Sequence, residues 1–181
     1  MPRPAQHLVA LAFALAALWA CAAQAHDGVH RASGSGSGSG STSLLKQWDF
    51  TLPSLDGRRF VQPSKIDGPV LVNFWGRDCP PCVAELPRLQ AFARDNPSWT
   101  VLLVATDTPT EASQFLAQRG ISLQSLRSGA NVSALMRTAG NRHGALPFSV
   151  AMRSGIVCQT QLGEVSAAQL DQVKVECTAP R

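Results

Sequence analysis

Two cysteines separated by two prolines are the residues best suited to chemistry in this chain of 181 residues. Cys79 precedes Pro80 and Pro81, and Cys82 follows them. With Cys79 as the N-cap of a helix, Pro80 takes the first helical position, where a missing N–H costs nothing. The free amide of Cys82 and the helix dipole then stabilise a thiolate, so we expect a lowered pKa for Cys79. The spacing also allows a disulfide across the first turn.

The same two cysteines allow three interpretations other than redox catalysis. They could form a purely structural disulfide, half of a zinc site, or a copper site completed by His143. A zinc site needs a second set of ligands, and His143 is the only histidine after residue 43. We therefore favour a redox-active dithiol that uses no metal and no other cofactor.

The residues around the cysteines predict a buried strand followed by a helix. The run Val-Leu-Val-Asn-Phe-Trp at 70–75 is typical of a central strand buried on both faces. Apolar residues then recur at helical spacing over 83–94. Similar patterns predict strands at 100–106, 148–152 and 156–160, and helices at 110–119, at 132–138 and after the capping pair Ser166 and Gln169. This order predicts an α/β fold with a central mixed sheet and helices on both faces.

The start of the chain carries signals for export rather than for folding. Arg3 gives a positive charge, residues 8–20 are apolar, and Ala23-Gln24-Ala25 fits a signal-peptidase site. Residues 1–25 are therefore predicted to be a signal peptide. Cys21 lies in a sequence similar to a lipobox, so the signal could instead end before Cys21 and leave it lipidated as a membrane tether.

A flexible linker and one folded domain follow the signal. Residues 26–43 include a Ser/Gly repeat, which cannot bury apolar surface and behaves as a flexible coil. Residues 44–181 are predicted to fold as one domain. The chain is 45% hydrophobic and 15% charged, which excludes a disordered protein. The formal charge of +4 is scattered, so we expect no nucleic-acid binding.

Several motifs resemble the TlpA/ResA branch of exported thioredoxin-like thiol–disulfide oxidoreductases, which is related to the AhpC/TSA and redoxin proteins. The matching motifs are Trp48 to Pro53 with Leu55-Asp56-Gly57, Val70 to Trp75, Cys79 to Cys82, Glu85-Leu86-Pro87, and Leu146-Pro147. They occur in the expected order across almost the whole predicted domain. The resemblance implies a thioredoxin-like fold with an N-terminal β extension.

The resemblance also implies a role for each matched residue. Cys79 would be the exposed nucleophile and Cys82 the shielded resolving thiol. Pro147 would be a cis-proline beside the disulfide, and Glu85 would raise the thiol pKa values and relay a proton. Substrate would be bound by three further positions: Trp75, Pro80 and Leu146.

Two of these assignments have plainer alternatives. Glu85 could be a solvated helix residue, and Pro147 could be an ordinary trans proline at a strand entry. The chain also departs from the family pattern at three positions. Asn73 replaces a buried aspartate of thioredoxins, Asp78 replaces the usual tryptophan before the first cysteine, and Phe148 replaces a small polar residue.

Cys158 and Cys177 form a second pair, predicted to lie on the last strand and just past the last helix. A structural disulfide between them would close a loop of about 20 residues and contribute roughly 3 kcal/mol. Two separate buried thiols and a second redox pair are the alternatives. An even number of cysteines after Cys21 suits an exported protein.

We predict a periplasmic thiol–disulfide oxidoreductase, either soluble or lipid-anchored. From the resemblance, it would reduce disulfides in exported proteins such as apocytochrome c and would be recycled by a membrane electron-donating thiol reductase. A disulfide oxidant, a copper or zinc metallochaperone using the same cysteines, and a non-catalytic adaptor are the competing hypotheses.

Overall fold

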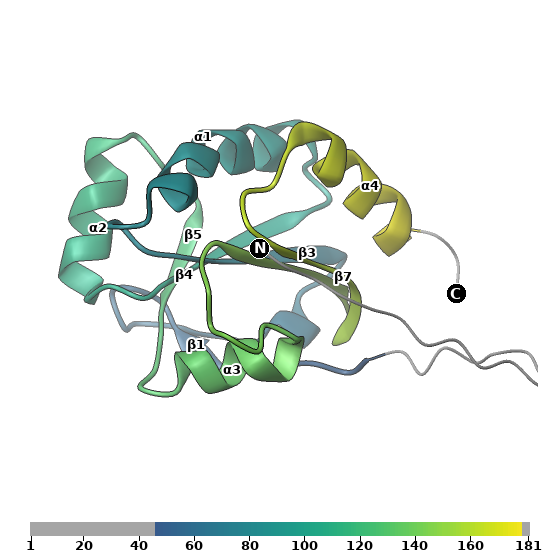
Figure 1. Cartoon of the computed structure of the whole chain (residues 1–181), viewed down its shortest axis with the longest axis horizontal. Coiled ribbons are helices and arrows are strands. Elements are labelled where there is room, and N and C mark those ends of the chain that lie inside the picture. Colours follow the sequence, from purple (N-terminus) through teal and green to yellow (C-terminus); the bar gives the residue numbers. More distant parts are fainter. Residues whose placement is uncertain (1–45, 179–181) are drawn as a thin grey trace, which may run out of the picture. The chain divides into compact units, whose positions relative to one another are not determined.

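The computed structural model of the chain describes residues 46–178 (Figure 1). The predicted signal peptide, the lipidation candidate Cys21 and the Ser/Gly-rich linker lie outside the described residues. No helix between residues 46 and 178 is long and apolar enough to cross a membrane.

A five-stranded mixed sheet forms the centre of the domain, in the order β5-β4-β3-β6-β7. The central strand β3 (Pro69–Trp75) runs parallel to β4 (Thr100–Ala105) and antiparallel to β6 (Phe148–Arg153). Strand β5 (Gln124–Arg127) runs parallel to β4, and β7 (Ile156–Leu162) runs antiparallel to β6.

Strand β3 is central because every one of its residues can be buried. All seven of its positions are buried, as expected for a strand covered on both faces. Since side chains alternate along a strand, Leu71 and Trp75 join one hydrophobic core while Val72 and Phe74 join the other. The last two side chains of β3, Phe74 and Trp75, are therefore held in the cores on opposite faces of the sheet.

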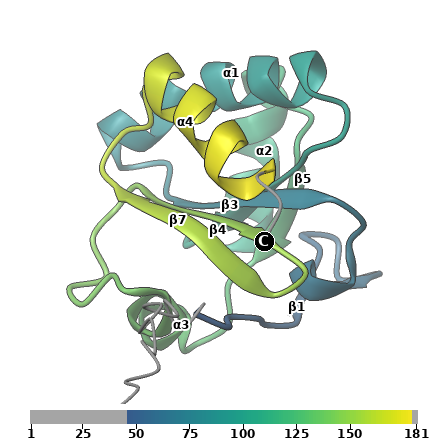
Figure 2. The same ribbon diagram turned by 90° about the vertical axis from the view of Figure 1, so that its right-hand side faces the viewer.

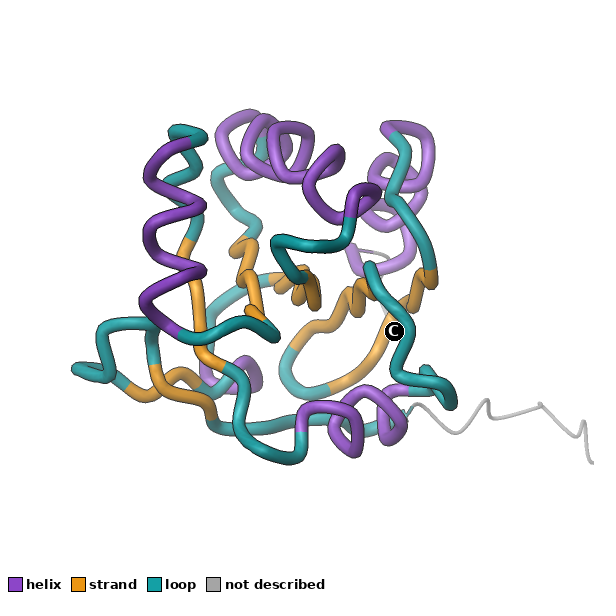
Figure 3. The backbone as a smooth tube through the Cα atoms, turned by 60° about the vertical axis from the view of Figure 1, so that its left-hand side comes forward, coloured by secondary structure: helices purple, strands orange, loops and turns teal. Residues whose placement is uncertain are grey.

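Helices cover both faces of this sheet, as the sequence predicts (Figures 2 and 3). One core contains residues of α1 (Pro80–Asp95), α2 (Pro109–Gln118) and α4 (Ala167–Thr178). The opposite core contains residues of α3 (Val132–Ala139) and of the N-terminal segment, including Trp48. Figure 2 shows α1 and α4 above the sheet and α3 below it.

The N-terminal segment adds the predicted β extension. A two-stranded antiparallel sheet pairs β1 (Leu52–Pro53) with β2 (Phe60–Val61), and a 3₁₀ turn, η1 (Pro63–Lys65), follows. The segment also bridges both edge strands of the main sheet: Gln47 pairs with Ile156 on β7, and Ser54 pairs with Leu126 on β5.

The structure differs from the sequence predictions at two places. Strand β5 was not predicted, because three of its four residues are polar or charged and a short edge strand lacks a clear apolar pattern. Cys177 lies inside α4 rather than past it, because the helix continues to Thr178. The turn between β6 and β7 has positive φ angles of 50° at Ser154 and 80° at Gly155.

Candidate active site

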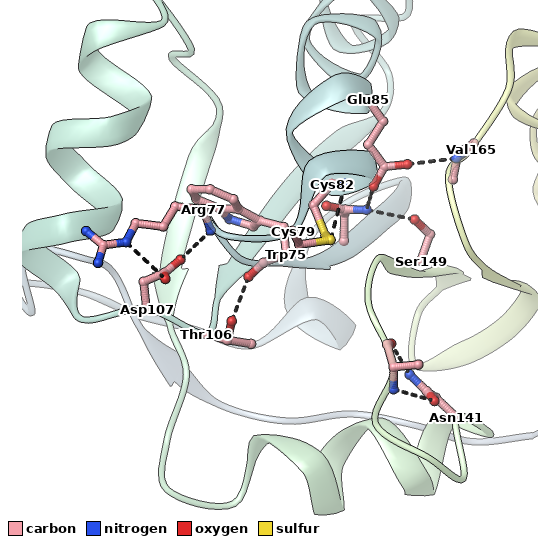
Figure 4. The surroundings of a disulfide bond; sticks show 12 residues. Trp75, Arg77, Cys79, Cys82, Glu85, Thr106, Asp107, Asn141, Ser149 and Val165 are labelled. Carbon is pink, nitrogen blue, oxygen red and sulfur yellow. Dashed lines mark hydrogen bonds and ion pairs between the residues drawn. A yellow bond between two sulfur atoms is a disulfide. The ribbon is translucent and has the colours of Figure 1, made fainter.

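The Cys79–Cys82 disulfide lies at the first turn of α1, with the two Cα atoms 5.3 Å apart (Figure 4). Cys79 is the N-cap, and its Sγ accepts a hydrogen bond from the Cys82 N–H at 3.3 Å. Pro80 begins the helix, as the sequence predicts. Cys79 is half-buried and Cys82 fully buried, so Cys79 presents its sulfur to a partner more readily.

The end of β4 holds the loop that leads into Cys79. Both the N–H and the Oγ1 of Thr106 donate to the carbonyl oxygen of Trp75, at 3.0 and 3.1 Å. The Arg77 N–H donates to Asp107 Oδ2 at 2.8 Å. A Cβ atom at Gly76 would lie 2.8 Å from Thr106 Oγ1, so this close approach of two loops requires glycine.

Trp75 does not take the substrate-binding role predicted for its side chain. The side chain is fully buried and packs against Phe115, with ring centroids 5.7 Å apart. The prediction is wrong because the alternation of β3 directs this residue into the core beneath α1 and α2. The Trp75 side chain is therefore part of the core beneath the cysteine loop.

The peptide bond between Leu146 and Pro147 is cis, as the resemblance implies. Pro147 is buried and Leu146 half-buried. Leu146 Cδ1 lies 3.7 Å from the position that a Cβ would take at Gly76, so the proline loop lies against the cysteine loop. The Gly163 N–H donates to the Pro147 carbonyl at 2.9 Å, which ties the same loop to the end of β7.

Asn141 positions this proline loop and was not identified from the sequence. Its side chain is buried, and its Nδ2 donates to the Ala145 carbonyl at 2.7 Å while its Oδ1 accepts from the Ala145 N–H at 3.2 Å. The one signal for it is the preceding Gly140, which ends α3 with a φ of 118°.

Glu85 is completely buried, so the solvated alternative for this residue is wrong. Its Oε1 accepts from Asn73 Nδ2 at 2.7 Å, and its Oε2 accepts from the Val165 N–H at 2.7 Å (Figure 4). Burial raises the pKa of the Glu85 carboxyl, while the hydrogen bonds from Val165 and Asn73 act in the opposite direction. Glu85 lies one helical turn beyond Cys82, which places an ionisable group with raised pKa close to the dithiol.

The departure at Asn73 is explained by this network. Asn73 Nδ2 also donates to Ser149 Oγ at 3.0 Å, so one amide joins Glu85 on α1 to Ser149 on β6. Asn73 Oδ1 is buried and has no hydrogen-bond partner within residues 46–178. The amide faces the Glu85 carboxylate with its Nδ2 rather than with this oxygen.

Charged side chains surround the exposed end of the site. Arg77 forms ion pairs with Asp78 at 3.6 Å, Asp107 at 3.9 Å and Glu111 at 2.9 Å. The Asp78 side chain is 89% exposed, next to Cys79 in the sequence. Asp78 is therefore the carboxylate most open to a partner that approaches Cys79, since the side chains of Asp107 and Glu111 are 14% and 38% exposed.

The second cysteine pair is disulfide-bonded and belongs to a different part of the domain. Cys158 on β7 is joined to Cys177 in the last turn of α4, with Cα atoms 5.3 Å apart. Both pack against the core beneath α1 and α4. His143 is exposed, and among residues 46–178 no three His, Cys, Asp or Glu side chains are grouped to hold a metal ion.

A protein-family model described as the AhpC/TSA family matches residues 46–152. A search among curated proteins found no match to the chain.

Solved structures resemble the chain over its described domain. The thioredoxin-related protein of Neisseria meningitidis serogroup B is 31% identical, with a TM-score of 0.61, and the match covers 69% of this chain and 97% of that one. A thiol:disulfide interchange protein of the thioredoxin family from Chlorobium tepidum is 20% identical, with a TM-score of 0.61 and coverage of 74% and 96%. The exposed lipoprotein thioredoxin of Streptococcus pneumoniae is 22% identical, with a TM-score of 0.59 and coverage of 70% and 98%. These similarities confirm the predicted thioredoxin-like fold.

Proposed function

Since the chain belongs to the AhpC/TSA family, we propose that it is a thiol–disulfide oxidoreductase that reduces disulfides in exported proteins. One observation carries this proposal. A disulfide at the start of a helix joins a half-buried Cys79, which accepts the Cys82 amide, to a fully buried Cys82. Such an arrangement gives the outer sulfur access and thiolate stabilisation, and it shields the inner sulfur.

The reaction begins from the reduced dithiol. The Cys79 thiolate attacks one sulfur of the substrate disulfide, forms a mixed disulfide and releases one substrate thiolate. Cys82 then loses its proton and attacks the Cys79 sulfur, which breaks the mixed disulfide and releases the second substrate thiolate. Two electrons have passed to the substrate, and the Cys79–Cys82 disulfide remains. A thiol reductase must return two electrons before the next cycle.

Glu85 supplies a proton acceptor for the second step. Cys82 is fully buried and must be deprotonated before it attacks. The Glu85 carboxylate lies one turn along the same helix, and its raised pKa fits a group that takes up and returns a proton.

The substrate would be held beside the cis-proline. Leu146 borders the cysteine loop, and Pro80 is exposed at the start of α1. We assign the backbone of Leu146 to pairing with an extended substrate segment, and Pro80 to contact with it. Trp75, the third position expected to bind substrate, is left out because its side chain is buried.

Export, and the partners that follow from it, are part of the same proposal. The sequence of residues 1–25 favours an export signal, with Cys21 as a candidate lipid attachment site. One structural neighbour is described as an exposed lipoprotein. We therefore propose a periplasmic location, a membrane thiol reductase as electron donor, and apocytochrome c as one substrate.

Trapping of covalent complexes tests the two cysteine roles. Cys82→Ser leaves the mixed disulfide unresolved, so this variant should accumulate disulfide-linked complexes with exported proteins. A reducing agent should separate these complexes. Cys79→Ser should accumulate none, because it lacks the attacking sulfur. A variant with Cys158→Ser and Cys177→Ser should behave like the native protein. Equal trapping by Cys82→Ser and Cys79→Ser would overturn the assignment.

The reduction potential tests the direction of electron flow. Equilibration of the protein in defined thiol buffers should give a value for Cys79–Cys82 near that of thioredoxin, about −270 mV. A value near about −120 mV would identify an oxidant of exported proteins and would overturn the reductase half of the proposal.

A further inference from the structure

The segment between β7 and α4, residues 163–166, is fixed at every residue. The Gly163 N–H donates to the Pro147 carbonyl at 2.9 Å, and the Val165 N–H donates to Glu85 Oε2 at 2.7 Å. The Ser166 N–H donates to Gln169 Oε1 at 2.8 Å and opens α4. This segment therefore touches both the proline loop and the buried carboxylate.

Arg88 holds the same segment at a second point on α1. It lies three residues beyond Glu85 on α1, and its Nη1 donates both to the Val165 carbonyl oxygen and to Glu164 Oε1, the latter at 2.9 Å. Val165 thus bonds to α1 through both of its backbone groups, with its N–H on Glu85 and its carbonyl on Arg88. Its side chain is buried in the core, which limits its movement further.

The charged groups that act on Glu85 come from two elements. Arg88 on α1 favours the charged carboxylate, and Glu164 on the 163–166 segment opposes it. The group that bonds to Glu85 from the sheet, the Asn73 amide, is uncharged, and so is Ser149, to which Asn73 also donates. Arg88 and Glu164 are also bonded to each other, so a change at either one alters the field at Glu85.

We propose that Arg88 is a positioning residue for the redox site: it holds Val165 in place so that the Val165 amide stays bonded to the Glu85 carboxylate. Without Arg88, the Val165 carbonyl oxygen loses its hydrogen-bond donor, and Glu164 loses its ion-pair partner. Both changes favour the protonated form of Glu85. The effect on the dithiol rests on the function proposed above, whereas the effect on Glu85 does not.

The direct test is the titration of the Glu85 carboxyl by NMR in the oxidised protein, in which neither Cys79 nor Cys82 titrates. Its resonance is assigned by its loss in Glu85→Gln. Arg88→Gln should move the titration of Glu85 to higher pH. Arg94→Gln is the matched control, because Arg94 lies on the same helix and also pairs with an acid, Asp95. It should leave the titration unchanged.

A double-mutant cycle separates positioning from charge. Glu164→Gln alone should move the titration to lower pH, because it removes a negative charge and leaves the Arg88 bond to Val165. If Arg88 acts by holding Val165, the titration should stay above that of Glu164→Gln in the variant with Arg88→Lys and Glu164→Gln together, because lysine keeps the positive charge that acts on Glu85 but not the planar fork. Equal titrations in these two variants would overturn the positioning role, because Arg88 would then act only through its charge.

The reduction potential as a function of pH gives a second readout. If Glu85 exchanges protons with the dithiol, the native profile should contain a bend that the profile of Glu85→Gln lacks. Arg88→Gln should then move this bend to higher pH, as it moves the NMR titration. A moved titration with an unmoved bend would support the positioning of Glu85 and count against its role in the reaction. An unmoved titration would overturn the inference whatever the activity.

If Arg88→Gln does not fold, Arg88→Lys replaces it, since lysine keeps the charge but cannot reproduce the planar fork. A shift in the same direction is then expected, and its absence is again decisive against the inference.

Discussion

The domain contains two disulfides that differ in everything around the bond. Cys79–Cys82 spans a sequence separation of 3, lies at the start of a helix and has one half-buried sulfur. Cys158–Cys177 spans 19 residues and fastens the last turn of α4 to an edge strand. One joins neighbours that the helix already holds together, whereas the other joins two elements that the chain alone leaves apart.

This contrast shows that the surroundings of a disulfide determine what it can do. At Cys79 a helix N-terminus and a free amide favour the thiolate, and the buried carboxyl of Glu85 lies one turn away. The residues described around Cys158 offer no such helix start, because Cys158 lies on a strand and Cys177 near the end of its helix. In the proposed function, disulfide exchange therefore belongs to the first pair, and we expect the second pair to stabilise the fold.

The strongest test of the contrast is the loss of disulfide reduction. Cys79→Ser removes the nucleophile, so the rate of insulin reduction should fall to roughly one-thousandth or less of the native rate. The variant with Cys158→Ser and Cys177→Ser should keep a rate within about twofold of the native one at a temperature where it is folded. Comparable losses of the reduction rate in both variants would contradict the assignment of disulfide exchange to Cys79–Cys82.

Unfolding in urea should show the opposite ranking. Removing the Cys158–Cys177 bond opens a loop with a separation of 19 residues, and the free energy of unfolding should fall by about 3 kcal/mol. The Cys79–Cys82 loop has a separation of 3, so its loss in Cys79→Ser with Cys82→Ser should cost at most about 2 kcal/mol. A larger loss from the shorter loop would contradict the assignment of stabilisation to the second pair.

The pH dependence of the free energy of unfolding tests the burial of Glu85 beside the first disulfide. Burial raises the pKa of Glu85 above its unfolded-state value, so its contribution to stability is fully present below the unfolded pKa. That contribution is lost as pH rises through the folded pKa. The stability of the native protein relative to Glu85→Gln should therefore fall as pH rises above about 4.5.

Glu111 is the matched control with the opposite sign. Hydrogen bonds from Thr108 lower the pKa of Glu111, so its contribution is present above the unfolded pKa and lost as pH falls through the folded pKa. Denaturant midpoints of Glu85→Gln and Glu111→Gln across pH check both slopes. Slopes of the same sign would contradict the burial argument for Glu85.

The smallest expected effect concerns Asp78. Its carboxylate is exposed beside Cys79 and disfavours the thiolate, so Asp78→Asn should lower the pKa of Cys79. The change should shrink at high salt because exposed charges are screened. The pH dependence of alkylation of the reduced protein measures it, with Asp95→Asn at the far end of α1 as control. An equal change in the control would exclude a local effect of Asp78.

The sequence predicted those parts of the fold and site that depend on neighbours along the chain. The start of α1 follows from Cys79 and the two prolines, and the burial of β3 follows from its apolar residues. The error at Trp75 was avoidable, since the period of two along β3 places it on the same face as Leu71, beneath the helices.

The remainder of the site depends on contacts between distant residues. Glu85 is 80 residues from Val165 in the sequence, and Asn73 is 76 residues from Ser149. No local pattern encodes these pairs, because the sheet order and the α4 connection bring them together. Arg88 and Val165, separated by 77 residues, escaped prediction for the same reason.

The segment that bridges both edge strands sets a practical boundary for the domain. Gln47 pairs with β7 and Ser54 with β5, so a stretch of chain shorter than ten residues pairs with the strands at both edges of the sheet. Unpaired edge strands recruit other chains and promote aggregation. A shortened protein that begins after Ser54 would expose both edges at once, although it would keep the four disulfide-bonded cysteines, Glu85 and Pro147. We therefore expect the solubility of the domain to depend on residues that take no part in the proposed chemistry.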